Sequence, residues 1–129
     1  MSTMKSHIIS AVIALQLAAT GTSAQTANEQ LNFFATCAGR LSAMMEFQWM
    51  FDGTQSEETM QQRNDVVRFI EAIMLPEQGR EIFQIRIASK QAHSALLTRA
   101  VFNDDVADAQ WARLQAARLT QECTAMLLS

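Results

Sequence analysis

Apolar side chains recur at steps of three and four residues through most of the chain, which is the spacing of one face of an α-helix. Between about residues 28 and 51 this stripe comprises Phe34, Cys37, Leu41, Met44 and Met45, and Gln48 continues its spacing. Residues that break helices are rare, because the segment 25–129 holds one proline and three glycines. The pattern therefore predicts an all-α protein built from long helices.

The first two helices are expected to meet at Asp52 and Gly53, where the glycine would take the left-handed turn that often follows a helix. Thr54 and Glu57 have the spacing of a capping box, which places the start of the second helix beside them. The second helix is then predicted to reach about Leu75.

Pro76 suits the first turn of a third helix, which is predicted to run to about Phe102. The polar run 103–105 is expected to cap a fourth helix. Four helices of similar length with short connections favour a small antiparallel four-helix bundle with up-down-up-down topology. The alternative is a steep crossing of the second and third helices at Pro76.

The N-terminal segment has the order of a secretory signal, with basic Lys5, an apolar run at 8–19 and small residues before Gln25. We therefore predict a signal peptide at 1–24, cleaved after Ala24, whether translation starts at Met1 or Met4. The run is shorter than the roughly 20 residues that span a bilayer, which disfavours the alternative of an uncleaved anchor.

The segment 25–129 is predicted to be a single helical domain, periplasmic or secreted, with no membrane span. It carries nine basic and 13 acidic residues, a formal charge of −4. The charges are dispersed and form no basic patch, which argues against binding to nucleic acid or anionic lipid.

Cys37 and Cys123 are the only cysteines, and an oxidising compartment makes a disulfide between them the expected state. In an up-down-up-down bundle the early part of the first helix and the late part of the last helix meet at one level. The two residues lie far apart in sequence, unlike the close pairs of redox proteins, so we expect a structural bond.

Gly39 lies inside the first helix, where glycine costs about 1 kcal/mol relative to alanine. We expect a neighbouring helix to approach closely there. Arg40 would then reach a carboxylate such as Glu122 at the end of the bundle.

His93 is the only histidine of the segment 25–129, and no second histidine stands near it in the pattern of a zinc site. It is expected to lie at the boundary between core and solvent. The alternative is a haem or copper site that His93 forms with methionines such as Met44 and Met45. We predict no bound cofactor, because the helical stripe already explains the methionines as core residues.

Four further apolar residues fall outside the stripes that one four-helix core would cover: Trp49, Phe83, Ile87 and Val101. Either the helices pack less regularly, or these residues form a surface for a protein partner or a second copy.

No nucleophile stands beside a base and an orienting group, so we do not expect an enzyme. The sequence thus predicts a non-enzymatic interaction or accessory protein of the cell envelope. A binder of a hydrophobic ligand, haem or copper is the second hypothesis, and an enzyme of unknown type is the third.

Overall fold

A computed structural model describes residues 20–129, so most of the predicted signal peptide lies outside the described residues. This part of the chain holds helices and no strands, and its four α-helices follow one another in sequence. They are α1 (Thr20–Gln48), α2 (Gly53–Ile73), α3 (Gly79–Phe102) and α4 (Val106–Ala125). Two short 3-10 helices, η1 (Pro76–Gln78) and η2 (Met126–Leu128), precede α3 and follow α4.

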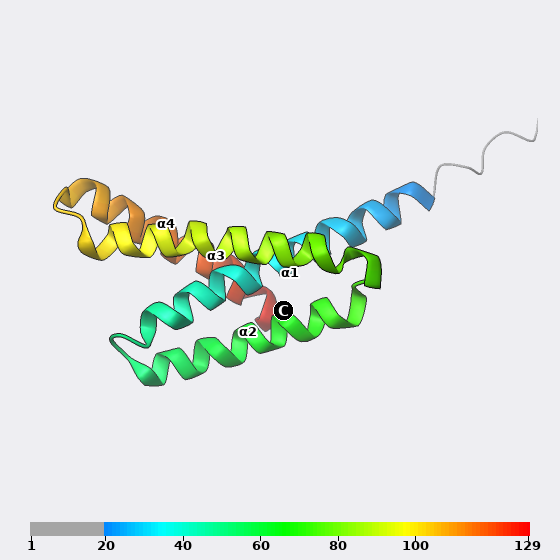
Figure 1. The fold of residues 1–129 in the computed structure, drawn as a ribbon, viewed down its shortest axis with the longest axis horizontal. Coiled ribbons are helices and arrows are strands. Elements are labelled where there is room, and N and C mark those ends of the chain that lie inside the picture. Colours follow the sequence, from blue (N-terminus) through cyan, green and yellow to red (C-terminus); the bar gives the residue numbers. More distant parts are fainter. Residues whose placement is uncertain (1–19) are drawn as a thin grey trace, which may run out of the picture.

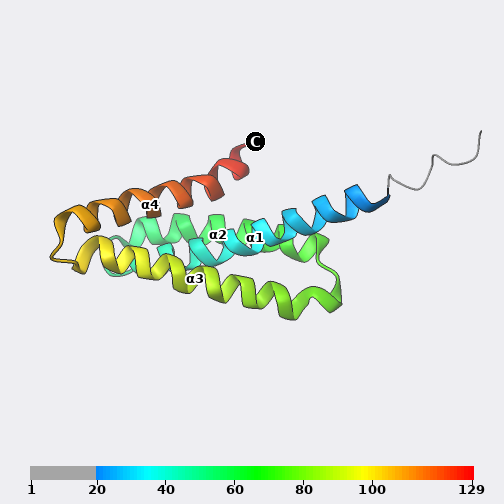
Figure 2. The same ribbon diagram turned by 90° about the horizontal axis from the view of Figure 1, so that it is seen from above.

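Successive helices run in opposite directions, as Figures 1 and 2 show, so the predicted antiparallel four-helix bundle is confirmed. The α1–α2 turn and the α3–α4 turn lie at the same end of the molecule, on the left in both views. The connection through η1 and the first turns of α1 lie at the opposite end, where α1 extends beyond the other helices.

Helix α1 occupies the centre of the bundle, because it packs against α2 and α3 and also meets α4. Helix α3 packs in addition against α4. Residues on more than one side of α1 are therefore buried, namely Leu31, Ala35, Cys37, Ala38, Leu41, Ala43 and Met45. The helices thus pack less regularly than in a square bundle, around a central helix that is covered on more than one side.

The core has two parts. The larger one joins α1, α2, the start of α3 and the end of α4, through Leu31, Ala35, Cys37, Ala38, Leu41, Val66, Ile70, Ile82 and Cys123. The smaller one joins α1, α3 and α4 nearer the two turns, through Ala43, Leu97 and Ala116. Small residues dominate the second part, which lets these three helices approach closely.

The predicted left-handed turn at Gly53 is wrong. Helix α1 ends at Gln48, and the side chain of Asp52 caps α2 by accepting a hydrogen bond from the backbone N–H of Gln55 at 3.1 Å. Gly53 is the first residue of α2, and no described residue has a positive φ. The aspartate satisfies one of the orphan N–H groups of the helix, so Thr54 lies inside α2 and is not its cap.

The starts of α3 and α4 agree better with the positions predicted from the sequence. Pro76 opens the single 3-10 turn of η1, and α3 follows directly from Gly79 to Phe102. The side chain of Asp105, within the predicted cap at 103–105, accepts a hydrogen bond from the backbone N–H of Asp108 at 3.1 Å.

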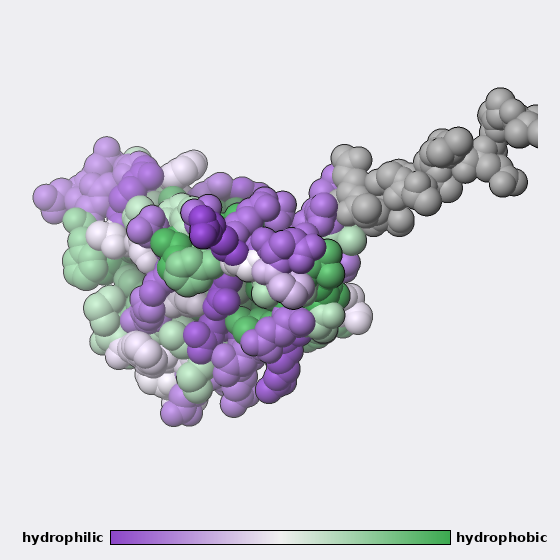
Figure 3. All heavy atoms as spheres, turned by 45° about the vertical axis from the view of Figure 1, so that its right-hand side comes forward, coloured by the Kyte–Doolittle hydropathy of each residue, from purple (hydrophilic) through white to green (hydrophobic). Residues whose placement is uncertain are grey.

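The surface seen in Figure 3 is mixed, because hydrophobic residues reach solvent at several places among hydrophilic ones. Within the described part of the chain, no helix combines the length and the apolar character needed to cross a membrane.

Candidate functional site

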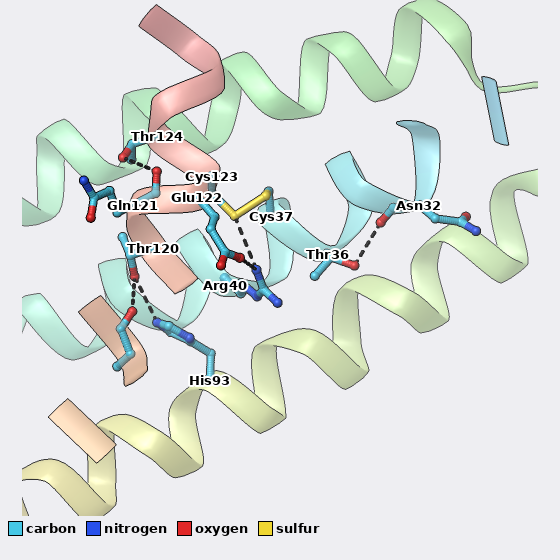
Figure 4. Close-up of a disulfide and its surroundings, with 11 residues drawn as sticks. Asn32, Thr36, Cys37, Arg40, His93, Thr120, Gln121, Glu122, Cys123 and Thr124 are labelled. Carbon is cyan, nitrogen blue, oxygen red and sulfur yellow. Dashed lines mark hydrogen bonds and ion pairs between the residues drawn. A yellow bond between two sulfur atoms is a disulfide. The ribbon is translucent and has the colours of Figure 1, made fainter. Parts of the chain in front are cut away.

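The predicted disulfide joins Cys37 in the middle of α1 to Cys123 near the end of α4 (Figure 4). Their Cα atoms lie 5.3 Å apart, and both residues are fully buried. The pairing is therefore confirmed, and it fixes α4 against the central helix. Burial keeps the bond away from soluble thiols, which agrees with a structural role.

Arg40 lies beside this disulfide on α1. Its Nη1 atom is 3.4 Å from Oε2 of Glu122 and 4.0 Å from Sγ of Cys123 (Figure 4). Glu122 also accepts a hydrogen bond from Nη1 of Arg118 at 2.8 Å. The ion pair expected between Arg40 and Glu122 is thus present, as a partly exposed link between α1 and α4.

Gly39, on the adjacent side of α1, faces the backbone of α3. A Cβ atom at this position would lie 2.8 Å from Cβ of Ser89 and 2.9 Å from the backbone N of Lys90. It would also overlap the carbonyl oxygen of Arg86. The close approach predicted for Gly39 is therefore confirmed, and α3 is the helix that makes it.

His93 is buried between α3 and α4, with 1% of its surface exposed, and does not lie at the boundary as expected. Its Nε2 atom is 3.2 Å from Oγ1 of Thr120, which donates its own hydrogen to the carbonyl oxygen of Ala116 (Figure 4). The Thr120 hydroxyl then accepts from Nε2–H, which leaves Nδ1 unprotonated and, in the described structure, without a hydrogen-bond partner. Burial, and secondarily the charge of Arg40, lower the pKa of His93 to about 4.

The methionines named beside His93 have packing roles. Met45 is buried in α1, and its carbonyl oxygen accepts a hydrogen bond from Oγ of Ser56 at 3.0 Å. Met44 packs against the small-residue part of the core. Within residues 20–129 no three His, Cys, Asp or Glu side chains gather as a group that could hold a metal ion.

Large apolar side chains are concentrated at the end of the molecule that carries both turns. We define this turn end as residues 48–60 and 99–113. Seven large hydrophobic residues there are exposed by between 45% and 78%: Trp49, Met50, Phe51, Val101, Phe102, Val106 and Trp111. Both tryptophans of the protein are among them.

Hydrogen bonds hold the α1–α2 part of the turn end in shape. The backbone N–H groups of Phe51 and Asp52 donate to the carbonyl oxygen of Gln48 at 2.9 Å and 2.7 Å. The ring of Phe51 lies 5.0 Å from that of Phe47, measured between centroids. The buried Ser56 fastens the start of α2 to α1 through its bond to Met45.

The α3–α4 part is held by a polar network around Asp108. Arg99 reaches both carboxylate oxygens of Asp108, at 3.2 Å and 2.5 Å, and its guanidinium carbon lies 5.2 Å from the ring centroid of Trp111. Asn103 also donates to Asp108. Hydrogen bonding to Arg99 lowers the pKa of Asp108, and the same contact raises that of Arg99.

Acidic residues dominate the charge of the turn end. Its six acidic residues are Asp52, Glu57, Glu58, Asp104, Asp105 and Asp108, whereas its basic residues are Arg99 and Arg113. The formal charge is therefore −4. The remaining described residues carry seven acidic and seven basic side chains, so the net charge of the domain resides at this end.

The structure divides the four residues predicted for an interface. All four are exposed, but only Trp49 and Val101 belong to the turn end, whereas Phe83 and Ile87 lie on the first half of α3. Sequence reasoning missed the other exposed turn-end residues: Met50, Phe51, Phe102, Val106 and Trp111. The sequence feature that could have identified them is the presence of apolar residues at and beside the predicted connections, where polar residues that face solvent are usual.

Comparisons of the chain with protein-family models, with curated proteins and with solved structures found no match.

Proposed function

We propose that this chain is an exported, non-enzymatic interaction module of the cell envelope, which binds another protein through the turn end. The observation that carries this proposal is that seven exposed large hydrophobic residues lie in and beside the two turns at one end of the bundle. Export is supported by the signal-like segment 1–24 and by the disulfide, a bond typical of oxidising compartments.

Exposed apolar surface of this kind is the usual mark of a binding site. Single exposed hydrophobic residues are common on soluble proteins, whereas groups of them point to a partner. Tryptophan, phenylalanine and methionine are also among the residues enriched at interfaces, and tryptophan is among those enriched at hot spots. The turn end holds two tryptophans, two phenylalanines and one methionine with exposed side chains.

The held backbone of both turns strengthens this proposal. A surface that is ordered before binding loses less conformational entropy when its partner docks. The cap at Asp52, the Ser56–Met45 bond and the network around Asp108 supply such order.

One observation favours a second function, binding of haem, copper or a hydrophobic ligand in the core. Nδ1 of His93 is buried without a hydrogen-bond partner, and the low pKa keeps the ring neutral at pH 7, the form that binds metals. A Soret band or bound copper that His93→Ala abolishes would favour this function. It ranks second because Met44 and Met45 already have packing roles.

Native mass spectrometry of the protein purified from the periplasm tests the leading proposal. We expect a mass that starts at Gln25, includes one disulfide and is accompanied by a complex with a protein partner. Trp49→Glu and Phe102→Glu should remove the complex while leaving circular dichroism and the unfolding midpoint unchanged.

Ile87→Glu is the control, because Ile87 is also an exposed apolar residue, at 40% against 63% for Trp49, but lies outside the turn end. A complex that survives both turn-end substitutions and is lost with Ile87→Glu would refute the proposed site. A protein that retains its leader and remains in the cytoplasm would refute the proposed export.

A further inference from the structure

We propose that the partner docks on the turn end with a cationic amphipathic segment, in which basic side chains surround an apolar face. This inference rests on the proposed function, because it takes the turn end as the binding surface. It goes further by assigning a chemical class to the partner, and the assignment comes from where the charges lie.

Acidic side chains stand beside the exposed apolar ones in both turns. Asp52 directly follows Phe51, and Asp104 and Asp105 stand between Phe102 and Val106. Glu57 and Glu58 add two exposed carboxylates in the second turn of α2. A partner that covers the aromatic residues would therefore bring its own rim close to these carboxylates.

The basic residues of the turn end are already engaged. Arg99 is held by both oxygens of Asp108 and by the Trp111 ring, and Arg113 donates to the carbonyl oxygen of Ala100 at 3.1 Å. Among the described residues, no ion pair involves Asp52, Glu57, Glu58 or Asp104. Basic groups on a partner would supply that charge, which favours encounter and selects against acidic partners.

The same charge disfavours two other occupants. In a two-fold dimer the same patch meets its copy, so two ends of charge −4 would face one another. An anionic membrane surface would repel the turn end for the same reason. A cationic protein segment is the occupant that satisfies both the apolar residues and the carboxylates.

Two synthetic helical peptides test this inference. Both carry the same leucine face, and the polar face is lysine in one and glutamate in the other. Binding is followed by the intrinsic fluorescence of Trp49 and Trp111, which both belong to the turn end. We expect the lysine peptide to bind at least about tenfold more tightly than the glutamate peptide. Its affinity should fall as NaCl is added.

Neutralising variants locate the effect. The triple variant Glu57→Gln, Glu58→Gln, Asp104→Asn removes three charges without touching the caps Asp52 and Asp105. We expect this variant to bind the lysine peptide about fivefold to tenfold more weakly and with a smaller dependence of the affinity on salt. The matched control, Glu71→Gln, Glu77→Gln, Glu81→Gln, changes the formal charge equally but outside the turn end.

The outcomes separate this inference from the proposed function. If both peptides bind equally, or both triple variants weaken binding equally, the assignment of a cationic partner is wrong although the turn end can still bind. If the double variant Trp49→Ala, Phe102→Ala leaves peptide binding unchanged, the turn end is not the binding surface and the proposed function is wrong as well. Tighter binding to vesicles of phosphatidylcholine and phosphatidylglycerol than to the lysine peptide would overturn the choice of a protein partner.

Discussion

Gly39 illustrates what a single residue reveals about packing. Its cost within a helix indicated that a neighbouring helix comes close, and this was predictable from the sequence. That the neighbour is the backbone of α3 at Arg86 and Lys90 was not predictable. The rotation of one helix relative to another depends on the whole core and leaves no local mark in the sequence.

Replacing Gly39 by alanine should therefore destabilise the protein despite the better helix propensity of alanine. Because the added Cβ would overlap the backbone of α3, we expect the free energy of unfolding to fall by about 2 kcal/mol or more. Urea denaturation measures this directly. Gly79→Ala is the control, because its Cβ meets nothing within 4 Å and its backbone is already helical, so it should be neutral or stabilising. Equal effects of the two substitutions would contradict the packing described for Gly39.

The burial of His93 depends on residues far from it in sequence. Its place on an apolar helix face suggested a boundary position, whereas the ring is almost completely buried and contacts α4. Its hydrogen-bond partner, Thr120, lies 27 positions away in sequence. Only the packing of α4 on α3 brings the two side chains together.

The buried ring makes stability depend on pH. The pKa of His93 is about 4 in the folded protein and near 6.5 when unfolded, so the unfolded state binds more protons between these values. The stabilisation is complete above about pH 7 and is lost as the pH falls from 6.5 towards 4, by up to about 3 kcal/mol. Denaturation at pH 7 and pH 4.5 should show this loss in the native sequence. His93→Gln should lose distinctly less over the same range, and equal losses would mean that His93 is not the titrating group.

The helices as elements were largely predictable, and their ends were less so. The repeat of apolar residues gave the number and order of helices, because it records the burial of one face over many turns. The cap of α2 was misplaced by two residues, at Thr54 instead of Asp52. Asp52, Thr54 and Ser56 all have capping side chains, and the choice depends on how the turn after Gln48 folds.

The cap of α4 can be tested by substitution of Asp105. Asp105→Ala removes the acceptor for the backbone N–H of Asp108 and should lower the free energy of unfolding by about 1 kcal/mol. Asp104→Ala, one residue earlier, removes the same charge without the cap and should have a clearly smaller effect. Hydrogen exchange should localise the change to the first turn of α4. A uniform change across all helices, or an equal effect of Asp104→Ala, would show that the cap does not hold this turn.

For the whole molecule, the disulfide followed directly from the sequence and the turn end did not. Two cysteines allow one pairing, and an antiparallel bundle brings Cys37 and Cys123 to one level. The turn end depends on which exposed residues share one end of the bundle, and turn residues have no periodicity to reveal it. The central position of α1 was likewise visible only as an excess of apolar residues around that helix.

Reduction of the disulfide should remove a large part of the stability of this small domain. The two cysteines are 86 positions apart, and the chain-entropy relation gives about 4.6 kcal/mol for a loop of that length. We expect the free energy of unfolding of the reduced protein to be about 3 to 5 kcal/mol lower than that of the oxidised protein. The reduced and oxidised forms of one chain are compared, so side-chain volume stays nearly constant. Equal stability of the two forms would show that the bond adds no constraint.

Helix α2 is linked to the rest of the molecule by fewer covalent and ionic contacts than the other three helices. The disulfide joins α1 to α4, and ion pairs join α3 to both of them through Lys90–Glu46 and Arg99–Asp108. Among the described residues no ion pair joins α2 to another helix, and its packing is chiefly against α1. Helix α2 should therefore open as a separate cooperative unit, with amide protons that exchange before those of α1, α3 and α4. The α1–α2 turn would be its hinge, so a partner seated on Trp49 and Phe51 would hold α2 closed and slow that exchange.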